Sequence, residues 1–141
     1  MKINRPFFVL APMDDVTDTV FRRIVADCAP ADYTVTEFVN VDALCSRGRD
    51  KVIRKLGVEL DTTPVIAQIW GKTPDNFETI ARELADGTIP GFVGVDLNFG
   101  CPEKNGVKNE CCSGLQQPAL RDKALKIIEA TQRGAVNFPV S

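Results

Sequence analysis

Short apolar runs alternate along the chain with longer stretches in which apolar residues recur at helical spacing. The short runs predict four buried strands, over residues 7–11, 33–38, 64–69 and 92–97. The stretches between and after them predict four helices, over residues 18–28, 41–56, 74–85 and 118–134, the last of which opens at Pro118 or Asp122. A further run at 136–140 indicates the start of a fifth strand.

Polar residues, proline and glycine mark the ends of these predicted helices. Thr17 or Asp18 is a suitable N-cap for the first helix. Its apolar face is predicted to consist of Val20, Phe21, Ile24 and Val25. The third helix has Pro74 at its first position, Gly87 after its end, and an apolar face of Phe77, Ile80, Ala81 and Leu84.

Strands that are apolar throughout and separated by helices are typical of a parallel sheet covered by helices, so the fold class is predicted to be α/β. Residues 1–141 contain no repeat, linker or low-complexity tract, which predicts a single domain. A closed (β/α)8 TIM barrel needs about 250 residues. The strand-helix units are therefore the first four to five units of an incomplete barrel, or they form an open α/β sheet, or they pair with a second chain.

Composition excludes several classes of protein. The formal net charge of −2 argues against a dedicated nucleic-acid-binding module, but not against an enzyme that holds RNA with a separate basic region. No apolar run approaches the roughly 20 residues that cross a bilayer, and an odd number of cysteines fits no disulfide framework, so we expect a cytoplasmic protein with no membrane association. The absence of histidine excludes His-based catalysis and the common zinc sites within these residues.

Polar or reactive residues follow the carboxyl ends of all four predicted strands. These segments are Ala11-Pro12-Met13-Asp14, Thr36-Glu37, Gln68 before Trp70-Gly71, and Asp96-Leu97-Asn98-Phe99-Gly100-Cys101-Pro102. Ligands bind at this end of a parallel sheet whose faces are covered by helices. The layout is the one expected of an enzyme.

The same four segments, in the same order, resemble those of the tRNA-dihydrouridine synthases, and the fourth is the most specific of them. The resemblance covers the whole chain. It implies an incomplete FMN-dependent barrel from an enzyme that reduces uridine in tRNA to 5,6-dihydrouridine with NADPH. By residue, it implies flavin contacts from Pro12, Met13, Asp14 and Gln68, a substrate contact from Asn98, and a proton donor at Cys101.

This chemistry is physically reasonable for these residue types. Reduction of the C5–C6 bond of uracil needs a hydride at one carbon and a proton at the other. The flavin supplies the hydride, which is the more difficult transfer, and the protein supplies an acid. A thiol with an ordinary pKa is protonated at neutral pH and serves as an acid. Asn98 offers a donor and an acceptor to the edge of uracil.

Structural roles are the alternatives for several of these residues. Cys101 would then be a small core residue, Gln68 a strand-end hydrogen-bonding group, and Asp14 with Asp15 a solvated turn; the role of Glu37 stays open. The adjacent pair at 111–112 lacks the spacing of a zinc loop, so no metal site is predicted there. Cys28 and Cys45 are predicted to be core residues.

The chain also differs from the family. A glycine-rich run is replaced by residues 109–117, and the family's strand-five lysine, its later histidine, its phosphate-binding loops and its helical RNA-binding domain do not occur up to Ser141. The chain alone is therefore expected to be inactive and to bind FMN weakly, and its open edge strands would favour self-association. The functional alternatives are another flavin barrel, such as a dihydroorotate or dihydropyrimidine dehydrogenase, and a non-catalytic half-barrel interaction module.

Overall fold

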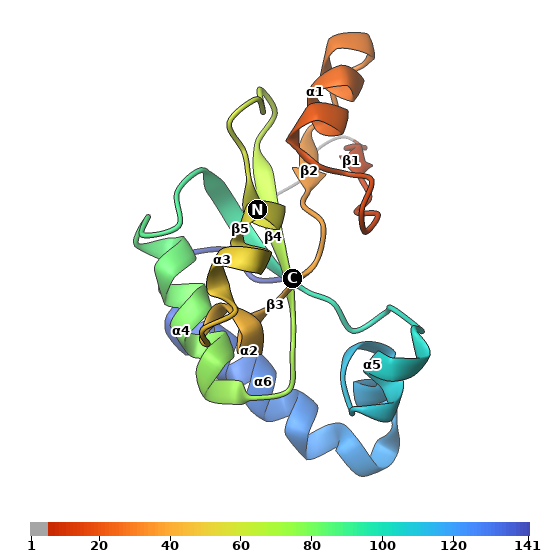
Figure 1. Ribbon diagram of the computed structural model, residues 1–141, viewed down its shortest axis with the longest axis vertical. Coiled ribbons are helices and arrows are strands. Elements are labelled where there is room, and N and C mark those ends of the chain that lie inside the picture. The colour runs from red at the N-terminus through yellow and green to blue at the C-terminus, as the bar shows by residue number, and fades with distance from the viewer. Residues whose placement is uncertain (1–5) are drawn as a thin grey trace.

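The strands pair in parallel throughout residues 6–141, the part of the chain that the computed structural model describes (Figure 1). Their order is β1–β2–β4–β5, and β3 pairs with β4 beyond the end of β2. A bridge between Val95 and Val140 places the predicted fifth strand beside β5. The strands are β1 (Val9–Leu10), β2 (Tyr33–Val35), β3 (Val39–Asn40), β4 (Val65–Trp70) and β5 (Phe92–Leu97).

Helices α2, α3, α4 and α6 lie on one side of β3, β4 and β5, whereas α1 stands apart beside β1 and β2 (Figure 1). The α-helices are α1 (Thr19–Cys28), α2 (Val41–Leu44), α3 (Arg49–Val52), α4 (Pro74–Ala85), α5 (Lys104–Lys108) and α6 (Arg121–Gly134). The 3₁₀ turns are η1 (Ile53–Leu56), η2 (Cys112–Gln116) and η3 (Pro118–Leu120). The α/β class with a parallel sheet is confirmed.

Two predicted elements are interrupted. The helix expected over 41–56 is broken into α2, α3 and η1, because the Ser46 hydroxyl donates to the Ala43 carbonyl and accepts from the Gly48 N–H, replacing helical hydrogen bonds. The second predicted strand leaves the sheet between β2 and β3. There the hydroxyl of Thr36, instead of a main-chain carbonyl, accepts from the N–H of Gln68 at 3.1 Å.

The core lies between the sheet and helices α4 and α6. Ala67, Ile69 and Val95 of the strands are buried in one cluster with Ile127 of α6. The predicted apolar face of α4 is confirmed, since all four of its residues are buried. Close approach of α4 and α6 requires Gly134, where a Cβ would stand 2.2 Å from the carbonyl oxygen of Glu78.

The predicted apolar face of α1 is wrong as a buried face. Val20 and Ile24 are 49% and 58% exposed, and the buried residue of this helix is Arg22. The reason is that Arg22 donates to the carbonyl of Gly57 and to Asp61, whereas α1 stands apart from the other helices of residues 6–141 (Figure 1). The predicted cap is confirmed, because Oδ1 of Asp18 accepts from the N–H of Phe21 at 2.8 Å.

The prediction for two of the five cysteines is also wrong. Cys28 and Cys45 are exposed, because they lie at the final residue of α1 and just after the end of α2, where the helices face solvent. Cys111 and Cys112 are buried, and all five thiols are free of disulfides. No helix formed within residues 6–141 has the length and apolar character needed to cross a membrane.

Candidate active site

Gln68 and Asp96 project from the face of the sheet opposite the helices. Side chains alternate along a strand, and Ala67 and Ile69 on either side of Gln68 belong to the core next to the helices. Gln68 and Asp96 are in register on the neighbouring strands β4 and β5, so they share the opposite face. Both lie near the carboxyl ends of their strands.

A continuous set of hydrogen bonds runs from Asp96 to the loop after β5, and we call it the amide relay. Oδ2 of Asp96 accepts from Nε2 of Gln68 at 2.6 Å. Oε1 of Gln68 accepts from Nδ2 of Asn98 at 3.1 Å. Oδ1 of Asn98 then accepts from the main-chain N–H groups of Gly100 and Cys101, at 3.2 and 3.0 Å.

Cys101 is half-buried at the end of this relay, and the segment containing α5 and η2 folds against it. Its carbonyl oxygen accepts from the N–H of Ser113 at 3.2 Å. Burial, together with the neighbouring Cys101, Cys111 and Glu103, raises the pKa of the Cys112 thiol to about 12. Burial also raises the pKa of the Cys111 thiol. These two thiols therefore stay protonated at neutral pH.

The segment Pro12–Asp14 follows β1 on the same edge of the sheet, separated from β4 by β2. The Thr17 hydroxyl accepts from the N–H of Met13 at 3.0 Å and donates to its carbonyl at 3.1 Å, which closes a turn around Asp15. Asp15 has a φ of 57°, a left-handed conformation in which aspartate is more frequent than most residues. The side chain of Met13 is 45% exposed.

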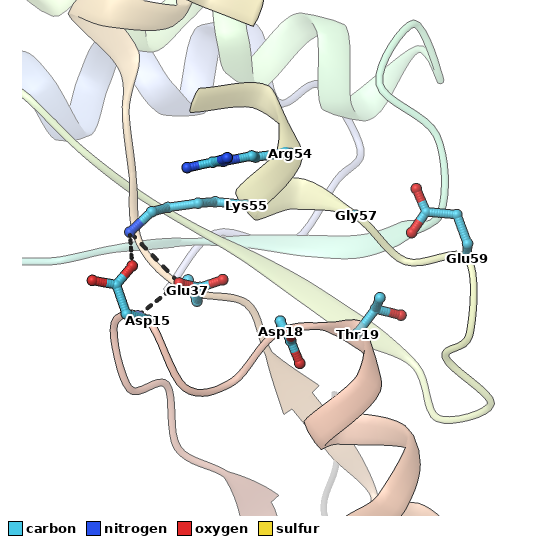
Figure 2. A pocket seen from close by; sticks show the side chains of 8 residues that line it. All are labelled: Asp15, Asp18, Thr19, Glu37, Arg54, Lys55, Gly57 and Glu59. Atoms are coloured by element: carbon cyan, nitrogen blue, oxygen red, sulfur yellow. Dashed lines mark hydrogen bonds and ion pairs between the residues drawn. The ribbon is translucent and has the colours of Figure 1, made fainter. Parts of the chain in front are cut away.

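Lys55 connects this turn to Glu37, which lies between β2 and β3 (Figure 2). Its ammonium contacts the carboxylates of Asp14, Asp15 (3.2 Å) and Glu37 (3.5 Å). Glu37 is buried and also accepts from the N–H of Asp15 at 2.7 Å. Burial opposes the charged ammonium, but the hydrogen bonds and attraction from these carboxylates outweigh it and raise the pKa of Lys55.

Lys55, Asp15 and Glu37 line a pocket of about 350 Å³. The carboxylates of Asp14, Asp15 and Glu37 have oxygens within 4.8 Å of one another, a spacing that suits a metal ion. The ammonium of Lys55 already contacts all three and offsets one of their three negative charges. The pocket lining includes Asp15, Asp18, Thr19, Glu37, Arg54, Lys55, Gly57 and Glu59 (Figure 2).

The structure thus brings Gln68, Asn98 and Cys101 together through direct hydrogen bonds, and places Pro12–Asp14 two strands away on the same edge. The structure also limits the hydrogen-bonding groups that Asn98 can offer to a ligand. The oxygen of its amide accepts from two backbone N–H groups, so an N–H remains for a ligand, whereas the sequence suggested both a donor and an acceptor.

Two residues of the site were missed from the sequence. Asp96 lies two positions before Asn98 in a strand, and that spacing on one face was the available signal. Lys55 carries no such signal, because it is 40 residues from Asp15 and 18 from Glu37. Its contacts depend on the tertiary fold.

Comparison with known proteins shows which family the chain resembles along its length. A family model described as dihydrouridine synthase (Dus) matches residues 9–141. A probable tRNA-dihydrouridine synthase of Staphylococcus aureus (strain COL) is 44% identical over 142 residues, covering 99% of this chain and 41% of the relative. A probable tRNA-dihydrouridine synthase 2 of Bacillus subtilis (strain 168) is 42% identical, with the same coverage.

This chain therefore spans 41% of the length of these relatives. The matched region contains every strand of the sheet and the whole amide relay. The chain belongs to the dihydrouridine synthase family.

Proposed function

We propose that the protein carrying this chain reduces uridine in tRNA to 5,6-dihydrouridine, with FMN as cofactor and NADPH as reductant. The observation that carries the proposal is the amide relay, which holds Cys101 beside two side-chain amides at the ligand-binding end of a parallel sheet. The names of the relatives support tRNA as the substrate. The sequence resemblance supports the flavin and NADPH.

The residues present fit the ring of a flavin better than its phosphate. Gln68 and Asn98 each donate one hydrogen bond within the relay, which leaves one further N–H on each amide for carbonyl oxygens of a bound ring. Lys55 already contacts three carboxylates, so it offers a phosphate no free ammonium. We therefore assign ring contacts to Gln68 and Pro12–Asp14 and place phosphate binding outside these residues.

Bound FMN would supply the hydride that one carbon of the uracil C5–C6 bond receives. The thiol of Cys101 donates its proton to the other carbon, and its sulfur is left as a thiolate that solvent reprotonates. Asn98 orients this step in two ways. Its oxygen fixes the backbone of Cys101, and its nitrogen donates to the base. The target uridine leaves its stack to reach this position.

A chimera tests the proposal most simply. The segment of the Staphylococcus aureus relative that matches this chain is replaced by residues 1–141, and the product is expressed in cells that lack their own dihydrouridine synthases. We expect a yellow protein that releases FMN on denaturation and restores dihydrouridine to tRNA. A folded chimera with FMN and no dihydrouridine would instead support a reductase of free pyrimidines.

The second candidate is a half-barrel without catalysis, which acts through an interaction surface. The exposed apolar residues of β1 and α1 favour it, because exposed apolar surface can mark sites of association. A folded chimera that binds neither flavin nor tRNA would support this alternative.

A further inference from the structure

The orientation of an amide decides what it offers to a ligand. A carboxylate only accepts hydrogen bonds, whereas the amides of Gln68 and Asn98 have an acceptor oxygen and a donor nitrogen at almost equivalent positions. Either amide keeps its shape when these two ends are exchanged. The groups at the two ends of the relay therefore determine which end faces which way.

From the Asp96 end, one orientation satisfies every contact. The carboxylate requires the nitrogen of Gln68, and the two atoms are 2.6 Å apart. The oxygen of Gln68 then faces Asn98 and requires its nitrogen, at 3.1 Å. That leaves the oxygen of Asn98 directed at the loop that contains Cys101.

The loop end imposes the same direction. The main-chain N–H groups of Gly100 and Cys101 both need an acceptor, and Oδ1 of Asn98 serves both. In the reversed relay these two N–H groups would face a donor, and the oxygen of Gln68 would face the carboxylate of Asp96. The amides of Gln68 and Asn98 are buried, and buried polar groups that face a like group are costly, so the relay has one stable direction.

We infer that Asp96 is a positioning residue that fixes the direction of the amide relay, so that Asn98 presents only an N–H donor to the bound base. The amide oxygen of Asn98 accepts two hydrogen bonds within the protein, and its nitrogen donates one, which leaves one N–H for the base. A carbonyl oxygen is the group that this N–H matches.

This inference rests on the proposed function for the identity of the base. Uracil carries a carbonyl acceptor at C4, where cytosine carries an amino donor. Against a donor-only Asn98, cytosine would place donor against donor. Asp96 would thereby contribute to the choice of uridine over cytidine without touching either.

A charge exchange between positions 96 and 98 tests the relay on the chain alone. In Asn98→Asp the new carboxylate still accepts from the loop, but Gln68 must now turn its oxygen toward one carboxylate or the other. The thermal unfolding midpoint should fall by about 5 °C or more. Adding Asp96→Asn allows Gln68 to reverse and satisfy both neighbours, so the double variant should recover at least half of that loss.

Asp122→Asn, combined with Asn98→Asp, is the matched control, because it removes the same charge from the first turn of α6. It should recover none of the loss. The relay would be overturned if Asp96→Asn and Asp122→Asn restored the thermal midpoint equally, or if Asp96→Asn restored none of it. Neither flavin nor RNA is needed, so this result is independent of whether the protein reduces uridine.

The donor-only assignment is tested in the chimera. The double variant Asp96→Asn/Asn98→Asp should stay folded and retain FMN but lose dihydrouridine formation by about 100-fold or more, since position 98 now presents an acceptor. Activity within a few-fold of the parent chimera would overturn the assignment. An inactive parent chimera would count against the proposed function and leave the stability result intact.

Discussion

The ammonium of Lys55 lies 3.5 Å from the carboxylate of Glu37, and this contact helps to connect the turn after β1 to the segment between β2 and β3. The same oxygen of Glu37 accepts from the N–H of Asp15 at 2.7 Å, so one buried carboxylate holds both a side chain and a backbone. The turn carries Pro12–Asp14, the segment proposed to lie against the flavin. The contact thus gives a structural role to Glu37, whose function the sequence left open.

Replacing Lys55 by methionine should loosen this turn. Asp14, Asp15 and Glu37 would be left as neighbouring carboxylates that repel one another. Hydrogen exchange of the peptide covering residues 12–18, followed by mass spectrometry, should become faster by about tenfold. Lys51→Met is the control, because Lys51 is exposed on α3. Unchanged protection in Lys55→Met would show that the turn does not depend on this lysine.

The buried pair of Arg22 and Asp61 should be among the most sensitive points of the fold. Arg22 donates to Asp61 from two nitrogens, at 2.8 and 2.6 Å, and to the carbonyls of Thr17 and Gly57. Arg22→Met leaves the buried carboxylate of Asp61 without a cationic partner, although the hydroxyl of Thr19 still donates to it at 2.9 Å. We expect a loss of about 3–5 kcal/mol in the free energy of unfolding, measured in urea.

Arg23→Met is the matched control for that variant, since Arg23 pairs with Asp27 on the surface of the same helix. It should change the free energy of unfolding by no more than about 0.5 kcal/mol. Similar losses in the two arginine variants would contradict the special role of Arg22.

Four of the five thiols should react with iodoacetamide in an order set by exposure and pKa. Cys28 is exposed and should react first. Cys45 is also exposed, but partial burial of its thiol and the charge of Glu83 raise its pKa, so a smaller fraction is thiolate and it should react more slowly than Cys28. Cys111 and Cys112 should react only after unfolding. Peptide mapping by mass spectrometry gives the order, and early labelling of Cys112 would contradict the packing of η2.

The apolar side of α1 should drive association of the isolated chain. Ile24 and Val20 are exposed together with Phe8 and Val9 of the preceding strand region. Ile24→Lys should shift sedimentation toward the monomer and leave the thermal midpoint nearly unchanged, because Ile24 contributes little to the core. Leu125→Lys, at an exposed leucine of α6, is the control. Equal sedimentation of parent and Ile24→Lys would exclude this surface as the contact.

The sequence predicted those elements whose signals are local. The apolar spacing, proline and glycine of α4 predicted its extent, and the mainly apolar run from Phe92 to Leu97 predicted β5 at the residues where it occurs. The break of the second helix was missed because two hydrogen bonds of Ser46 decide it. Periodicity identified the apolar side of α1 but did not reveal that Arg22, on another side, is the buried residue.

In the candidate site, too, the sequence predicted the features with local signals but not those that depend on the tertiary fold. Gln68 lies near the end of β4, and Asn98 and Cys101 follow the adjacent parallel strand β5, so their proximity could be predicted from the strand ends alone. The direction of the amide relay could not, because it depends on the register that sets Asp96 beside Gln68.

The most direct test of the proposed function compares Cys101→Ala with the parent chimera in one tRNA assay. Only the proton donor is removed, so the variant should bind FMN and accept electrons from NADPH as the parent does, while dihydrouridine formation falls by about 100-fold or more. Loss of the bound flavin, or dihydrouridine formation at the parent rate, would contradict the assignment of Cys101 as the acid.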